Sequence, residues 1–171
     1  MLRLSKITDY GIVLLAHMAS CGDRAVDENG HARHTARQLA KEVTLPLPVV
    51  SKILKSLARG GIIESHRGAK GGYSLHADHQ EITVATMIAV LEGPVAMTEC
   101  SASAGLCLLE SSCSVRDPWQ IINRVVRNAL SEITLRDLAP PDPAGPPTLD
   151  RFFKVPSTQT VASATATTGE C

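Results

Sequence analysis

Three cysteines, Cys100, Cys107 and Cys113, lie close together in a stretch rich in small and polar residues. Six residues separate the first from the second, and five separate the second from the third. Thiolates are preferred ligands of soft metal centres such as zinc and iron–sulfur clusters. Because the backbone over residues 101–105 (Ser-Ala-Ser-Ala-Gly) is pliable, the three sulfurs can converge on one centre. The spacing therefore predicts a metal-binding loop, which is typical of a sensor.

The composition limits how many elements can hold this loop in place. The chain has 171 residues, which suffices for one small domain with an additional helix. Basic and acidic residues number 17 each, but residues 1–76 hold 11 basic against 6 acidic ones and residues 77–171 hold 6 against 11. The N-terminal part is therefore expected to bind a polyanion. Five cysteines are too few for a disulfide framework and favour the reducing cytoplasm.

An apolar run near the N-terminus resembles a lipoprotein leader, because basic residues precede it and Cys21 follows it. Asp9 and His17 interrupt the run, and its apolar residues keep helical spacing, which favours a core helix over about 5–19. Asp9 lies off the apolar stripe and is expected to point outward. No stretch reaches the roughly 20 apolar residues that a membrane span requires. The stripe comprises Ile7, Tyr10, Gly11, Leu14, Leu15 and Met18.

A helix–turn–helix motif is expected between residues 35 and 59. Thr35 and Gln38 form a capping box that starts a short helix, and residues 44–47 turn the chain into a second helix, 48–59. The second helix has an apolar face and a polar face with three cations, which is the pattern of a DNA-recognition helix. The apolar face comprises Val50, Ile53, Leu54 and Leu57. The polar face comprises Ser51, Lys52, Lys55, Ser56 and Arg59.

A glycine-rich hairpin follows the second helix. Residues 62–66 and 73–76 have strand character, and the tip between them carries Arg67 and Lys70. Glycines let the backbone approach a phosphate ridge, and an arginine suits the electronegative minor groove. The hairpin is interpreted as a wing, with Arg67 in the minor groove and the polar face of the second helix on the major groove or its phosphates. A winged helix that binds a protein is the alternative, and salt-dependent binding to duplex DNA would exclude it.

Two further helices are expected around the cysteine loop. Thr83 caps a helix over 84–92 that ends at Gly93, and a long helix is expected to start with Asp117 as N-cap and Pro118 at its first position. The long helix carries an apolar stripe that needs a partner. Pairing with the same helix of a second subunit is expected, with packing on its own domain as the alternative. The predicted dimerisation residues are Trp119, Ile122, Val126, Ala129, Leu130 and Ile133.

The expected fold is mainly α with a small β-hairpin wing: a winged helix–turn–helix domain with a long dimerisation helix. Its parts are a DNA-binding domain (1–92), a cysteine loop (93–117), the dimerisation helix (118–138) and a disordered, proline-rich tail (139–171). No nucleophile signature is present, so an enzyme is not expected. A zinc site is not expected at the group Cys21, His31 and His34, because no fourth ligand has supporting spacing.

Several short motifs follow one another along residues 1–139: Thr8-Asp9-Tyr10-Gly11, the recognition-helix segment 50–55, the wing segment 67–73, the three cysteines, Trp119 and residues 133–135. Together they resemble the IscR/NsrR-type (Rrf-type) winged-helix regulators, which sense iron–sulfur cluster status, iron, nitric oxide or redox state. Segments 45–48, 92–94 and 98–101 are similar to the branch that regulates the Suf iron–sulfur assembly operon. The resemblance implies a homodimeric transcriptional repressor, an operator with two half-sites, and a [2Fe-2S] or [4Fe-4S] cluster on the three cysteines.

The fourth ligand of such a cluster is left open by the resemblance. The iron–sulfur cluster regulator of this group has a histidine three residues after its third cysteine, where this chain has Arg116, which has no lone pair to give. In the nitric-oxide-sensing branch the aspartate of the Thr-Asp-Tyr-Gly motif completes the cluster from the other subunit. This implies Asp9 as ligand, with Glu99 or Glu110 as local alternatives. A zinc-stabilised regulator and an iron–sulfur electron-transfer protein are the competing interpretations.

Overall fold

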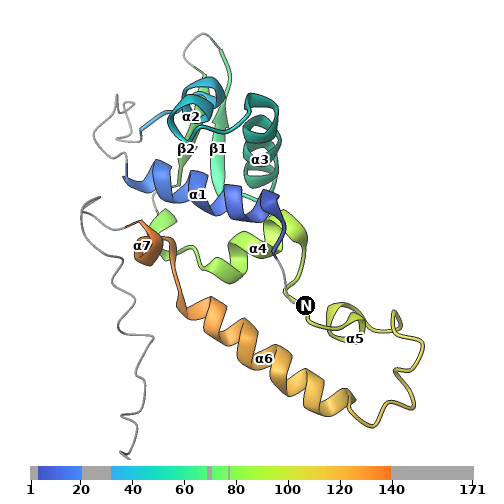
Figure 1. Ribbon diagram of the computed structural model, residues 1–171. Coiled ribbons are helices and arrows are strands. Elements are labelled where there is room, and N and C mark those ends of the chain that lie inside the picture. The colour runs from blue at the N-terminus through green and yellow to red at the C-terminus, as the bar shows by residue number, and fades with distance from the viewer. Residues whose placement is uncertain (1–3, 21–31, 69–70, 77, 140–171) are drawn as a thin grey trace, which may run out of the picture.

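The computed structural model describes residues 4–20, 32–68, 71–76 and 78–139 (Figure 1). In the described residues the fold is mainly helical with one two-stranded antiparallel hairpin, which confirms the expected fold class. The elements are α1 (Lys6–Ser20), α2 (Ala36–Glu42), α3 (Leu47–Arg59), β1 (Ile63–His66), β2 (Gly72–Leu75), η1 (His79–Glu81), α4 (Val84–Glu92), α5 (Glu99–Ala102), α6 (Arg116–Glu132) and α7 (Leu135–Leu138).

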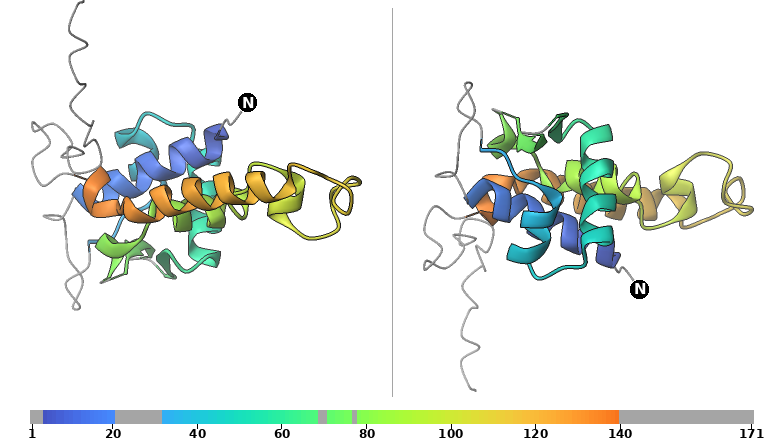
Figure 2. Two further views of the ribbon diagram at one scale, coloured as in Figure 1. Left: turned by 90° about the horizontal axis from the view of Figure 1, so that it is seen from below. Right: turned by 90° about the horizontal axis from the view of Figure 1, so that it is seen from above.

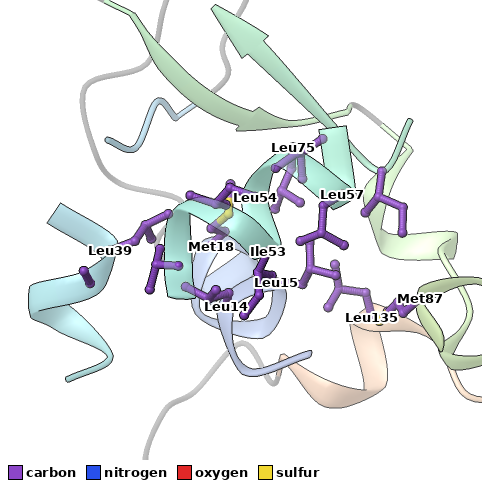
Figure 3. Packing of buried hydrophobic residues seen from close by; sticks show 14 residues of the cluster. Leu14, Leu15, Met18, Leu39, Ile53, Leu54, Leu57, Leu75, Met87 and Leu135 are labelled. Carbon is purple, nitrogen blue, oxygen red and sulfur yellow. The ribbon is translucent and has the colours of Figure 1, made fainter. Parts of the chain in front are cut away.

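The hydrophobic core lies where α1, α3 and the hairpin meet, and α2, α4 and α7 close its sides (Figure 3). The predicted apolar face of α3 is fully buried, and Leu14, Leu15 and Met18 of α1 pack in the same cluster. Each such side chain contributes about 1.5–3 kcal/mol on burial. Leu135 of α7 is also fully buried, so the C-terminal end of the described chain is anchored in the N-terminal domain.

The start of α1 is fixed by the end of α4. Gly11 is buried, and a Cβ there would lie 2.5 Å from a methyl group of Leu91, so a larger residue would require the Leu91 side chain to move. The backbone N–H of Ser5 donates to Glu92 Oε1 at 2.6 Å. Hydrogen bonds from the Thr8 and Ser5 side chains lower the pKa of Glu92 below its ordinary value, so its carboxylate stays charged at this junction.

The hairpin is attached to the segment that precedes α2. Its register pairs Ile63 with Leu75 and Ser65 with Tyr73. Tyr73 also exchanges two backbone hydrogen bonds with His34, of 2.8 and 2.9 Å. A Cβ on Gly72 would lie 2.8 Å from the His34 carbonyl oxygen, so only glycine allows this approach. The predicted strands are confirmed within one residue at each end.

The start of α6 differs from the prediction by two residues. The helix begins at Arg116 with Val115 as N-cap, so Asp117 and Pro118 lie inside the first turn rather than at the cap and the first position. Proline is tolerated there because first-turn N–H groups have no intrahelical partner, and an aspartate is favoured by the helix dipole. At its other end, α6 stops before Ile133, whose carbonyl oxygen accepts a 2.8 Å hydrogen bond from the Val84 N–H.

The long helix α6 passes under the domain along α4 and carries the cysteine loop beyond it (Figures 1 and 2). The chain returns to the domain through a β-bridge between Thr83 and Thr134. Thr83 also caps α4 by accepting from the Thr86 N–H, as predicted. The loop is therefore held at the far end of a helix whose near end is anchored in the core.

Candidate DNA-binding face and cysteine loop

The outer face of α3 presents its cations to solvent, as expected. Lys52, Lys55 and Arg59 are exposed, while Ser51 is half-buried. Thr35 caps α2, because its hydroxyl oxygen accepts a hydrogen bond from the Gln38 N–H at 3.2 Å. The turn between α2 and α3 contains Thr44 at φ 56°, a left-handed conformation that favours glycine. The two helices and their tight turn therefore present three positive charges on one surface.

The wing lies beside α3 (Figure 1). Arg67 is exposed at the end of β1, at the start of the turn that joins the strands. That turn contains Gly68 at φ 102°, and the Gly71 N–H donates to the Gly68 carbonyl oxygen at 2.9 Å. Lys70, the second predicted cation of the tip, lies outside the described residues. Arg67 and the α3 cations thus occupy neighbouring parts of one basic surface.

The three cysteines are free thiols, and all are half-buried. Cys100 lies in α5, and Cys107 and Cys113 follow in the irregular loop. Within the described residues of this single chain, no three His, Cys, Asp or Glu side chains are gathered so that they could hold a metal ion. The donor types suit a soft metal, but a common centre requires the loop to close further or a second chain to contribute.

The loop is braced by Glu110, one of the alternative ligands. One carboxylate oxygen accepts the Gly105 N–H at 2.6 Å, and the other pairs with the Arg116 guanidinium at 3.0 Å. Both oxygens are therefore engaged in holding the loop, which weakens the case for Glu110 as a ligand. Glu99 and Asp9 are exposed, Asp9 as its position off the apolar stripe predicted.

Two amide side chains of α6, which the sequence did not single out, connect the cysteine loop to that helix. Asn123, 3% exposed, accepts the Met97 N–H at 3.1 Å, and Gln120 donates to the Cys100 carbonyl oxygen at 3.1 Å. The Thr98 hydroxyl lies 3.3 Å from the Cys100 sulfur. Asn123 is the one buried residue of α6. The backbone around Cys100 is therefore positioned by α6 itself.

We expect Asn123→Ala to lower the free energy of unfolding by about 1–3 kcal/mol, because it leaves the Met97 N–H without its acceptor. Urea denaturation followed by circular dichroism measures this difference. Asn128→Ala is the matched control, since it removes an exposed amide from the same helix and should change stability little. Equal stabilities of the two variants would show that the Asn123 contact contributes nothing.

The predicted dimerisation stripe is divided by the structure between two faces of α6. Val126 and Leu130 are half-buried on the side of the helix that carries the buried Asn123, and Ile133, which follows the helix, is also half-buried. Ile122 and Ala129 are exposed. The exposed pair continues into two residues outside the predicted set, Ile121 (60% exposed) and Val125 (62% exposed). Trp119, 37% exposed, lies at the boundary. The face open to a partner is therefore centred on Ile121, Ile122, Val125 and Ala129, the exposed stripe.

Of the group Cys21, His31 and His34, the first two lie outside the described residues. His34 is buried, and its backbone is bonded to Tyr73. Among the helices that the structure describes, none combines the length and apolarity needed to cross a lipid bilayer.

Together, the helix–turn–helix, the basic hairpin and the appended helix define a winged-helix DNA-binding regulator. The Rrf2 family, described as an iron-dependent transcriptional regulator, matches residues 4–141, and the chain belongs to this family. It is a transcriptional regulator and not an enzyme. This confirms the resemblance to the Rrf-type winged-helix regulators that was drawn from the sequence motifs.

Individual relatives cover most of the chain. The HTH-type transcriptional repressor NsrR of Streptomyces coelicolor is 27% identical over 145 residues, which is 85% of this chain and 93% of that protein. The HTH-type transcriptional regulator CymR of Bacillus subtilis is 27% identical over 138 residues, 81% of this chain and 90% of that protein.

Solved structures show the same architecture. CymR, described as the global cysteine regulator of B. subtilis, superposes with a TM-score of 0.62 and 27% identity, covering 81% of this chain and 97% of that one. IscR of T. potens superposes with a TM-score of 0.54 and 25% identity, covering 80% and 85%.

Proposed function

We propose that this regulator is a homodimeric, cytoplasmic repressor that binds a two-half-site operator through α3 and the wing. Its affinity depends on an iron–sulfur cluster held by Cys100, Cys107 and Cys113, and its targets are iron–sulfur cluster assembly genes. The observation that carries the proposal is three free, half-buried thiols on one loop attached to α6 by Gln120, in a family described as iron-dependent. Thiolates are the ordinary ligands of such clusters, which supply the sensitivity to iron and oxidants.

The contact between the loop and α6 supports a route from the cysteines to the DNA-binding face. A change in the Cys100 backbone reaches α6 through Gln120, and α6 is joined to the domain at α4 and α7. If the exposed stripe pairs two subunits, a shift of α6 changes the spacing between their recognition helices. That spacing decides whether both helices fit successive major grooves. Anaerobic purification, with a visible spectrum and iron and sulfide counts, tests the cluster directly.

Arg67→Ala should weaken binding to a target promoter by about 1–3 kcal/mol if the side chain reads bases in the minor groove. Competition between the promoter fragment and a random duplex at fixed salt measures this loss of discrimination. Arg136→Ala is the control, because Arg136 is exposed in α7 and pairs with Glu81 at 3.1 Å. Equal weakening on both duplexes, with a flatter salt dependence, would reduce Arg67 to a phosphate contact.

Asp9→Ala should speed the loss of visible absorbance in air by about tenfold or more. Loss of a hydrogen bond that supports a metal ligand already lowers metal affinity about tenfold or more, and loss of the ligand itself should have at least as large an effect. Glu99→Ala and Glu110→Ala test the local alternatives in parallel. Glu132→Ala, which removes an exposed acid at the C-terminal end of α6, is the control. An unchanged rate for Asp9→Ala together with a faster rate for Glu99→Ala would transfer the role to Glu99.

A second candidate is a metal-free regulator that responds through its thiols. It is favoured by the structural similarity to CymR, described as a cysteine regulator. Visible absorbance separates the two candidates, because free thiols and zinc thiolates do not absorb visible light. Colourless protein with stoichiometric zinc would instead identify the zinc-stabilised regulator.

A further inference from the structure

A cleft of about 510 Å³ lies between the recognition helix and the wing, and two of its lining residues, Ser65 and Tyr73, are not among the predicted DNA contacts. Its walls come from the C-terminal half of α3 and from both strands of the hairpin. The hairpin lies beside α3 (Figure 1). We call this cleft the α3–wing cleft. Its lining residues are Lys55, Ala58, Arg59, Ser65 and Tyr73. Of these lining residues, which are the ones that the structure describes, two are cations, two carry hydroxyl groups, and none is acidic.

The hairpin register explains why the hydroxyl groups of Ser65 and Tyr73 line this cleft and the Glu64 carboxylate does not. Ser65 and Tyr73 are paired across the strands, so their side chains lie on the same face. Because successive strand residues alternate between faces, Glu64 points to the opposite side. There its carboxylate lies 3.2 Å from the His76 ring and 3.8 Å from the His66 ring. Among the described residues, the lining of the cleft therefore carries two cations and no carboxylate.

The arginine of the cleft is held along its own helix. Arg59 Nε donates to the Lys55 carbonyl oxygen at 3.4 Å, and Nη2 donates to the Ser56 hydroxyl at 3.3 Å. A guanidinium has five N–H donors, so these contacts orient the group without using all of them. The backbone of Tyr73 is fixed as well, through its two hydrogen bonds to His34. Both walls of the cleft are thus partly preorganised before any ligand arrives.

We propose that the α3–wing cleft binds a phosphodiester of the DNA backbone, with Ser65 and Tyr73 as contacts beside Lys55 and Arg59. The proposal rests on the proposed DNA binding by α3 and the wing. A helix in the major groove and a wing in the adjacent minor groove are separated by one sugar–phosphate backbone. That backbone must pass between α3 and Arg67, where the cleft lies. Phosphate contacts of this kind set the register of a protein on DNA without reading its sequence.

Neutral and charged members of the cleft give different expected signatures. Tyr73→Phe and Ser65→Ala should each raise Kd about three- to tenfold on promoter and random duplex alike, because each removes one hydrogen bond. Their salt dependence should stay that of the parent. Arg59→Ala should weaken both duplexes and lower the slope of log Kd against log salt by about 1. Lys52→Ala, on the same helix outside the cleft, is the matched control for the methylphosphonate cycle below.

A series of promoter fragments, each with one neutral methylphosphonate, locates the contact. At one backbone position in each half-site, the modification should cost the Arg59→Ala and Tyr73→Phe proteins less affinity than it costs the parent, while it weakens Lys52→Ala as much as the parent. Additive losses at every position, or unchanged binding by the Tyr73→Phe, Ser65→Ala and Arg59→Ala proteins, would overturn the proposal while DNA binding itself stands.

Inorganic phosphate distinguishes the two sources of this ligand chemistry. At equal ionic strength, phosphate should compete with duplex DNA no better than chloride does if the cleft is shaped for a backbone phosphodiester. Competition by millimolar phosphate that Arg59→Ala abolishes would assign the cleft to a free phosphate instead and overturn the assignment to DNA. Absence of duplex binding by the parent would overturn the proposed function as well.

Discussion

Protein in which Cys100, Cys107 and Cys113 are all replaced by serine is expected to leave an anaerobic purification colourless and free of iron and sulfide, whereas the parent is coloured. A serine oxygen is a harder and, at neutral pH, protonated donor, so it cannot replace three soft thiolates. The expected change in iron content is close to complete. Visible spectra with iron and sulfide counts on equal amounts of folded protein measure it.

The same triple variant should bind its promoter with one affinity whether iron is supplied or chelated, because the regulator has lost its sensor and kept its DNA-binding face. Replacement of Cys21 and Cys171, the two cysteines outside the loop, is the matched control and should leave colour and response intact. A colourless parent, or a triple variant that still responds to iron as the parent does, would contradict the proposed cluster. The winged-helix regulator would remain.

The domain around the loop was predictable because its signals are local or strictly periodic. The apolar stripe of α1 and the apolar face of α3 are buried as their spacing indicates. Thr83 and Gly93 mark the ends of α4 through cap chemistry that acts within one turn. The hairpin followed from its glycines and flanking strands. The start of α6 was predicted two residues late, because Asp117 and Pro118, which suit the N-cap and the first position of a helix, are also tolerated inside its first turn.

The candidate site was less predictable, because its contacts join residues distant in sequence. Nothing in the composition of the loop shows that Glu110 holds Gly105 and Arg116 rather than a metal. Asn123 gave no sequence signal except its position among apolar residues at helical spacing, which places an amide on the buried side. Cysteine spacing indicates which atoms are available as donors, but it does not determine whether one chain alone gathers them.

The division of the α6 stripe shows the limit of periodicity on a helix with two neighbours. A hydrophobic pattern identifies which residues avoid water, but it does not divide them between the domain and a second subunit. In the structure, Val126 and Leu130 are half-buried on the same side as Asn123, and Ile121, Ile122 and Val125 remain exposed. Exposed apolar surface of this kind on a protruding helix marks an interface. We propose that a second copy of the same helix, related by a two-fold axis, packs against this exposed stripe, because a two-fold interface pairs the same surface of both subunits.

Val125→Glu should convert the protein to a monomer at concentrations at which the parent is dimeric. Val125 is 62% exposed at the middle of the exposed stripe, so a two-fold axis would bring both new carboxylates into the interface. An unpaired buried charge costs about 3–5 kcal/mol, which corresponds to a dimer Kd raised more than about 100-fold. Sedimentation equilibrium over a range of protein concentrations measures the shift.

Arg127→Glu is the matched control, because Arg127 is exposed two residues further along α6 and therefore on the opposite side of the helix. It makes a larger change in charge but should leave the dimer intact. If two linked half-site contacts provide the operator affinity, the Val125→Glu monomer should bind the full operator about 100-fold or more weakly, yet bind an isolated half-site like the parent. A dimeric Val125→Glu protein, or a monomeric Arg127→Glu protein, would place the interface on another face. The regulation proposed for α6 would then lose the element that links two recognition helices.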